Sequence, residues 1–107
     1  MSRVVAVTGD LLFGSRIQKT LESSGHQVEL SEVPDPSADL LIVDLPAFGD
    51  PGSLAGLSCP VLGYYSHVDP GPRDAALEAG VELAVPRSRL VREMPELVEA
   101  LLEGQGD

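Results

Sequence analysis

Cysteine and basic side chains are scarce in this chain of 107 residues, and each shortage excludes a class of protein. Cys59 is the only cysteine, so the chain forms no internal disulfide and has too few thiolates for a structural zinc site. Its 7 Lys and Arg side chains are outnumbered by 17 Asp and Glu, which gives a formal net charge of −10. Such a surface repels nucleic acid and anionic membranes, so we expect the chain to bind neither.

Long hydrophobic runs are also missing. No segment approaches the roughly 20 apolar residues of a membrane span, and the apolar stretch near the N-terminus is too short for a signal peptide. We therefore expect a cytoplasmic protein. Hydrophobic residues make up 43% of the chain and charged residues 22%, which are ordinary values for a globular protein. The length fits one domain over residues 1–107.

Five segments have the composition of β-strands. Residues 4–7 and 40–43 are continuous apolar runs, as expected for strands covered on both faces of a sheet. Residues 60–65 are the fourth predicted strand. Residues 26–31 alternate between polar and apolar side chains, which is typical of a half-exposed strand at the edge of a sheet. Residues 82–85 are the fifth predicted strand.

Helices are predicted between these strands from the spacing of apolar residues. Phe13, Ile17 and Leu21 recur every four residues and mark one buried helix face. A short helix is possible over 53–57, and an alanine-rich one over 73–78. Pro95 suits the first turn of the last helix. The apolar face of that last helix is predicted to consist of Met94, Leu97, Val98, Leu101 and Leu102.

The order of these elements predicts the fold. Alternating strands and helices in a short chain form a parallel sheet with right-handed crossovers. Five strands with the second at an edge fit the flavodoxin-like α/β fold, a three-layer sandwich with strand order 2-1-3-4-5. Pro34 and Pro36 exclude a regular helix over 32–37. The helix between the second and third strands is therefore predicted to be shortened or missing.

Polar side chains follow the predicted strands at the edge where open parallel sheets bind their ligands. An acid follows the third strand, hydroxyl groups follow the fourth and a cation follows the fifth. In chain order the residues at these strand ends are Thr8, Gly9, Asp10, Asp44, Tyr65, Ser66 and Arg87. This arrangement resembles the receiver domain of two-component response regulators (CheY-like domains). The segments ADLLIVDLP over 38–46 and ALEAGVE over 76–82 carry the same resemblance.

The resemblance implies a role for each strand-end residue. Asp44 lies where receivers keep the aspartate that accepts a phosphoryl group, and Arg87 lies where they keep a lysine that pairs with it. Tyr65, or Ser66 one residue later, lies where they keep the Thr or Ser hydroxyl that reports phosphorylation. Ala84 falls on the aromatic switch position of the fifth strand, so that aromatic side chain is absent.

The metal site of receivers is the clearest departure. The acidic pair that holds Mg²⁺ falls here on Thr8 and Gly9, and Asp10 comes one position late. Mg²⁺ is normally anchored by one or two carboxylates, and without it nothing neutralises the charge on a transferred phosphoryl group. We therefore expect no metal and no other cofactor. Arg87 is expected to hold Asp44 in a static ion pair, because a guanidinium favours planar pairing with carboxylates.

The resulting prediction is a pseudo-receiver, a signalling or scaffold module that is not an enzyme. The resemblance implies that it binds a protein partner or a second copy through the face of the fourth helix, fifth strand and fifth helix. A first alternative is a working phosphoacceptor, in which Asp10 and Asp44 hold Mg²⁺. A second is a small-molecule or nucleotide-binding domain, although the turn before the first helix has only Gly9 and Gly14 of the three glycines that dinucleotide binding needs.

Simpler interpretations of single residues also remain open. Asp44 is then only an acid at a strand end, Asp10 caps the first helix, and Arg87 is an ordinary surface residue. His26 and His67 are expected to be solvated. Cys59 is expected to lie in the core, since a free cysteine behaves as a small apolar side chain.

Overall fold

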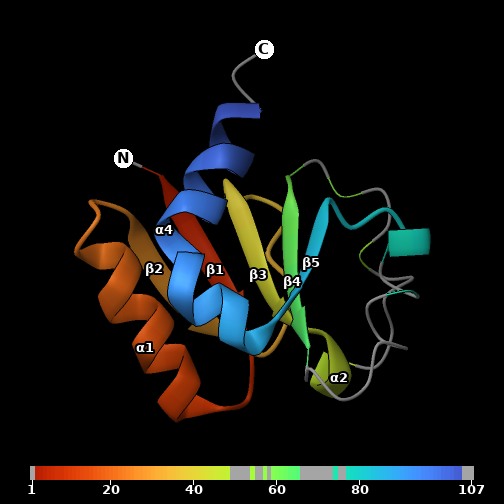
Figure 1. Ribbon diagram of the computed structural model, residues 1–107, viewed down its shortest axis with the longest axis horizontal. Helices are drawn as coiled ribbons and strands as arrows, with labels where there is room; N and C mark the ends of the chain where they lie inside the picture. Colours follow the sequence, from red (N-terminus) through yellow and green to blue (C-terminus); the bar gives the residue numbers. More distant parts are fainter. Residues whose placement is uncertain are drawn as a thin grey trace.

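A five-stranded parallel sheet forms the centre of the molecule in the computed structural model (Figure 1). The structure describes residues 2–48, 54, 57, 59–65, 74 and 77–104. The strand order is β2-β1-β3-β4-β5, as predicted from the sequence. The strands are β1 (Arg3–Val7), β2 (Gln27–Ser31), β3 (Leu40–Asp44), β4 (Val61–Tyr65) and β5 (Leu83–Pro86).

Two long helices cover one face of this sheet, which is the front face in Figure 1. They are α1 (Leu11–Glu22) and α4 (Arg87–Gly104), and the short α2 (Leu45–Phe48) follows directly after β3. Helix α2 was not predicted, and the short helix predicted over 53–57 lies mostly outside the described residues. Pro46 fits the first turn of α2, where its missing N–H needs no partner. None of the helices in the described residues is long and apolar enough to cross a bilayer.

The strands are buried because each contributes side chains to two cores. On β1, Val4 and Ala6 pack against α1 and α4, whereas Val5 and Val7 point into the opposite layer. Every residue of β3 and β4 is buried. The continuous apolar runs in the sequence therefore reflect a sheet covered on both faces.

Helix α1 has the N-terminal cap that its sequence predicts. Asp10 is the N-cap, and its carboxylate accepts a hydrogen bond of 3.0 Å from the backbone N–H of Phe13. The predicted face of Phe13, Ile17 and Leu21 is buried. Gly25 follows the helix with φ at +94°, a conformation that side chains with a Cβ rarely adopt. The capping interpretation of Asp10 is confirmed.

Helix α4 starts earlier than predicted. It begins at Arg87, and Pro95 lies in the first turn of its second half rather than in the first turn of the whole helix. The two halves meet at Glu93, whose φ of −120° and ψ of 18° are not helical. A proline ring displaces the carbonyl four residues before it, which explains the break. The predicted apolar face is confirmed, with Met94, Leu97 and Val98 buried and Leu101 and Leu102 packed at its margin.

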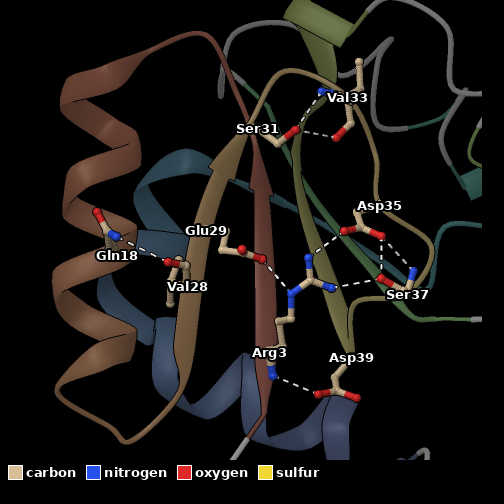
Figure 2. Close-up of polar contacts among 9 residues, drawn as sticks. All are labelled: Arg3, Gln18, Val28, Glu29, Ser31, Val33, Asp35, Ser37 and Asp39. Carbon is tan, nitrogen blue, oxygen red and sulfur yellow. Dashed lines mark hydrogen bonds and ion pairs between the residues drawn. The ribbon is translucent and has the colours of Figure 1, made fainter.

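No helix connects β2 to β3, as the two prolines predict, and residues 32–39 cross the sheet as turns and extended chain. Arg3 of β1 holds this crossover in place (Figure 2). Its guanidinium donates hydrogen bonds to Glu29 on β2 and to Asp35, both at 2.6 Å, and to the Ser37 hydroxyl at 3.0 Å. Its backbone N–H donates to Asp39 at 2.8 Å.

The outer face of β2 is polar, which fits the missing helix. Gln27, Glu29 and Ser31 alternate with Val28 and Leu30, and only the last two pack against the core under α1. An edge strand with one polar face needs no covering layer. The predicted helix over 73–78 lies mostly outside the described residues. Its end is described, however, with Leu77 and Glu78 helical and Gly80 at a φ of +101°.

Candidate functional site

The strand register brings the predicted site residues to one edge of the sheet. Val7 lies beside Val43, and Asp44 lies beside Tyr64 in the paired strands. Because all five strands run in the same direction, the residues that follow β1, β3 and β5 meet at their carboxyl ends.

Asp44 is the buried acid of this edge. It is the last residue of β3, and its side chain is 10% exposed. The carboxylate makes no hydrogen bond with the described residues. Its nearest charged neighbour is Arg87, whose Nη2 lies 3.9 Å from its Oδ2.

Arg87 lies between two carboxylates. Besides the contact with Asp44, its Nη1 is 3.7 Å from Oδ2 of the α1 cap, Asp10. Both contacts are ion pairs, and their lengths exceed that of a hydrogen bond. The predicted pairing of Arg87 with Asp44 is therefore present, but Arg87 is shared with Asp10 and is not an ordinary surface residue.

Two aromatic rings lie beneath the Arg87 guanidinium. Its central carbon is 4.6 Å from the centre of the Phe13 ring and 5.5 Å from that of Tyr64. The two rings contact each other, with centres 4.9 Å apart. A guanidinium over aromatic faces gains a cation–π attraction, so the rings and the two carboxylates act together to hold the side chain.

Tyr64 is fully buried, and its hydroxyl has no hydrogen-bond partner in the described part of the chain. Burial raises the pKa of Tyr64 to about 12. The negative charges of Asp44 and Asp10 act in the same direction, whereas the neighbouring Thr8 hydroxyl and the Arg87 cation act against it. This hydroxyl is therefore neutral at physiological pH.

Thr8 and Gly9 are the residues that the resemblance places at the acidic-pair positions of receivers. Thr8 is buried, and its hydroxyl accepts a hydrogen bond of 3.0 Å from the backbone N–H of Asp10. Gly9 has no side chain, and a Cβ built there would meet nothing within 4 Å. The loop before α1 thus has room for a larger side chain at Gly9 but presents no carboxylate before Asp10.

The described residues do not fit a Mg²⁺ site. No three His, Cys, Asp or Glu side chains among them are grouped closely enough to hold a metal ion. Of the two acids named for the metal alternative, Asp10 uses one oxygen as the helix cap. Its other oxygen and the carboxylate of Asp44 both face the Arg87 guanidinium. A cation from the chain itself therefore lies where the metal alternative requires an ion.

The two tyrosines of β4 point to opposite sides of the sheet. Tyr65, which the resemblance places at the hydroxyl switch position, is buried in the layer opposite α1 and α4. Tyr64 is the one whose ring contacts Arg87. Ser66 and His67 lie outside the described residues.

A hollow of about 220 Å³ adjoins Asp44. Thr8, Gly9 and Asp44 line it together with Glu32 and Phe48. Pockets for small molecules usually measure from about 300 Å³ upward. The hollow is therefore small for the nucleotide alternative.

Two residues differ from or add to the expectations drawn from the sequence, and a third agrees with them. His26, expected to be solvated, is buried, and its Nε2 lies 2.8 Å from a carboxylate oxygen of Glu99. The pairing joins positions 73 residues apart, which sequence spacing does not reveal. Phe13 was recognised only as a core residue of α1. Cys59 is buried as expected, and burial raises the pKa of its thiol.

No protein-family model and no curated protein sequence matches the chain. Solved structures do match it over nearly the whole length. A response regulator receiver protein from Burkholderia phymatum is 26% identical, with a TM-score of 0.80 and 96% of each chain covered. The non-phosphorylated HemR receiver domain from Leptospira biflexa is 19% identical, with a TM-score of 0.77 and coverage of 95% of this chain and 94% of that one.

A third similar structure is a CheY-like response regulator receiver domain protein from Methanospirillum hungatei JF-1. It is 14% identical, with a TM-score of 0.80 and coverage of 99% of this chain and 97% of that one. The observed strand order agrees with these similarities. The chain therefore has the fold of the response-regulator receiver (CheY-like) domains.

Proposed function

We propose that this receiver domain is a signalling or scaffold module that acts by binding protein and does not use metal-dependent phosphorylation. The observation that carries the proposal is the position of Arg87 between Asp10 and Asp44. A receiver-type fold supports a role in signalling, and such domains are generally modules without enzymatic activity of their own.

The chemistry of phosphoryl transfer supports the proposal that the domain does not use metal-dependent phosphorylation. Charge spreads over the transferred group in the transition state, and a divalent ion normally neutralises it. Thr8 and Gly9 supply no carboxylate for such an ion. An incoming ion would also meet the positive charge of Arg87 between the two remaining acids.

The packing around Arg87 supports a fixed rather than a switching site. The guanidinium is held by two carboxylates and two rings, so moving it breaks four contacts at once. A planar guanidinium also differs from the compact ammonium of lysine, which pairs as a point charge. Asp44 is proposed to stay paired with Arg87, and Tyr65 or Ser66 would then have no phosphoryl group to report.

Intact-mass spectrometry tests the proposal directly. The chain is incubated with acetyl phosphate, a small phosphodonor, and Mg²⁺. We expect no change in mass, and Asp44→Asn is the control for modification elsewhere. A gain of one phosphoryl group that Asp44→Asn abolishes would establish the phosphoacceptor alternative instead.

A matched gain-of-function variant sharpens the test. Thr8→Asp, Gly9→Asp and Arg87→Lys together restore the receiver pattern, and the open space at Gly9 accepts the new side chain. We expect this triple variant to gain a phosphoryl group under conditions in which the natural sequence does not. If neither chain reacts, the loss of reactivity does not originate in these three positions.

Thermal unfolding with added nucleotides tests the small-molecule alternative. A nucleotide at 100 times its dissociation constant stabilises a protein by about 2.7 kcal/mol, which thermal unfolding detects easily. We expect no such shift with nucleotides, because the hollow beside Asp44 is small and acidic.

A further inference from the structure

Strand β2 has a free edge, because it is the outermost strand on its side of the sheet (Figure 1). The backbone N–H of Gln27 donates to the Ser2 carbonyl, so Gln27 faces the neighbouring β1. Backbone groups along a strand point alternately to its two sides, and the N–H and C=O groups of Val28 and Leu30 therefore point away from β1. No other strand among the described residues pairs with these four groups.

A side chain occupies one of these four groups in place of a strand. Gln18 of α1 donates a hydrogen bond of 3.2 Å from its Nε2 to the Val28 carbonyl (Figure 2). A side-chain amide carries the same kind of N–H donor as a peptide group. Gln18 therefore takes the position that the N–H of an added strand would take. The backbone groups of Leu30 have no such substitute among the described residues.

Two adjoining hollows follow this edge. One measures about 420 Å³ and is lined by residues 26–29, and the other measures about 220 Å³ and is lined by residues 29–31. Arg3 lines both, so together they accompany β2 from its start to its end. The outer face of β2 is open here because the crossover over residues 32–39 contains no helix. The edge thus has room for a further extended chain.

The hollows are acidic. Glu22, Glu29 and Asp35 line them, and Arg3 is the only Lys or Arg side chain among the described lining residues. The Arg3 guanidinium is already bonded to Glu29 and Asp35, both at 2.6 Å. Glu29 nevertheless remains 56% exposed. A cationic strand is attracted to this lining, whereas a second copy of the chain brings a net charge of −10 and its own Glu29.

We propose that β2 is the docking edge for an extended segment of a partner protein in which cationic and apolar residues alternate. The segment adds a sixth strand, with backbone hydrogen bonds to Val28 and Leu30. Its side chains alternate between the two faces of the sheet. The cationic residues lie on the outer face beside Glu29, and the apolar residues lie on the other face beside Val28 and Leu30. Docking displaces the Gln18 amide from the Val28 carbonyl.

This partner rests on the protein-binding role proposed above and specifies it. The edge lies at the opposite side of the sheet from β5, so it differs from the face of the fourth helix, fifth strand and fifth helix that the resemblance implies. It also differs from the site of Asp44. A failure of strand docking would leave the mass measurement on Asp44 unaffected, and phosphorylation of Asp44 would leave strand docking in place.

Fluorescence anisotropy with a labelled heptapeptide, KVKVKVK, tests the proposal with the intact chain. We expect saturable binding, and the charge-reversed peptide EVEVEVE should bind at least about tenfold more weakly. Sedimentation velocity of the chain without peptide tests the other occupant of the edge, a second copy of the chain. We expect a monomer in that measurement, and a dimer that KVKVKVK does not dissociate would overturn the proposal.

Methylated peptides are the matched controls, because a methyl group on a backbone nitrogen removes one N–H donor. One peptide carries methyl groups on the nitrogens of its valines, and the other on those of its two inner lysines. An added strand directs only one of these sets at β2, the valines in an antiparallel strand and the lysines in a parallel one. One methylated peptide should therefore bind at least about tenfold more weakly, and the other should bind like KVKVKVK. Equal affinities of the two would overturn the proposal.

Variants of the chain test the two contributions separately. Gln18→Ala frees the Val28 carbonyl and should strengthen peptide binding about two- to fivefold. Glu22→Lys should weaken it at least about threefold, because it reverses a charge beside the edge. The control is Glu78→Lys, the same charge change at an exposed acid ahead of β5, which should alter binding by less than about twofold. Thermal unfolding checks that each variant is folded.

Hydrogen exchange locates the bound peptide. In the free chain the backbone amides of Val28 and Leu30 should exchange faster than those of Glu29 and Ser31, which face β1. Saturating KVKVKVK should slow the exchange of Val28 and Leu30. Binding without this protection, weaker binding to Gln18→Ala, or no binding at millimolar peptide would each overturn the proposal.

Discussion

Replacing Arg87 by methionine removes the charge from the site and keeps most of the side-chain stem. The Arg87 side chain is 46% exposed and its two ion pairs are long, so each ion pair contributes less than about 1 kcal/mol. The contact with the rings of Phe13 and Tyr64 adds roughly 0.5–1 kcal/mol. We expect Arg87→Met to lose about 1–2 kcal/mol, which lowers the melting temperature of a domain this size by about 5–10 °C.

The same variant leaves Asp10 and Asp44 without a cation between them. A divalent ion should then be attracted to the two carboxylates and stabilise the variant. At ten times its dissociation constant, the ion contributes about 1.4 kcal/mol. The natural sequence should gain nothing from Mg²⁺ at the same concentration, because Arg87 already lies between the acids.

Differential scanning calorimetry with and without Mg²⁺ measures both effects. Arg92→Met is the matched control, since Arg92 lies on the same helix and contacts only the neighbouring Glu93 among the described residues. It should change stability by less than about 0.5 kcal/mol. The reasoning fails if Arg87→Met melts like the natural chain, or if Mg²⁺ stabilises both proteins equally.

Three further substitutions test other parts of the structure. The Ser37 hydroxyl and the Arg3 guanidinium lower the pKa of Asp35 from its ordinary value of 3.8 to about 2. The ionised carboxylate therefore stabilises the fold fully above pH 3.8, and this stabilisation is lost as the pH falls from 3.8 to about 2. Asp35→Asn should therefore flatten this part of an acid unfolding curve, and an unchanged curve would contradict the pairing. Tyr64→Phe removes a buried hydroxyl without a partner, so stability in urea should stay equal or rise by up to about 1 kcal/mol, and the absorbance change near pH 12 should disappear. Gly63→Ala would place a Cβ 2.6 Å from the buried Leu45 side chain, so the free energy of unfolding in urea should fall by about 1–3 kcal/mol. An unchanged free energy of unfolding would mean that α2 packs more loosely against β4 than described.

The strands and their order could be predicted because their signals are local. Continuous apolar runs such as residues 40–43 occur when both faces of a strand are covered, and the alternation over residues 26–31 marks an edge strand. The prediction that Asp44 and Arg87 lie at the carboxyl ends of the strands followed from the parallel order of those strands alone. Asp10 as a helix cap was likewise visible from the residues that follow it.

The remaining features depend on contacts between distant parts of the chain. The first half of α4 is rich in charges, and its apolar contacts through Leu90 depend on the sheet beneath it. The contact of His26 is with a glutamate 73 residues away. The rings under Arg87 come from α1 and β4, and either one alone looks like an ordinary core residue.

The hydrogen bonds of Arg3 to the crossover between β2 and β3 determine how this segment can move. An amphipathic helix at this place would have to expose apolar surface in order to detach. Between residues 32 and 39 only Ala38 is buried, so the segment can lift from the sheet by giving up polar contacts and little else. Added salt should therefore speed the hydrogen exchange of the backbone amides of Ser37 and Ala38, while those of β3 stay protected.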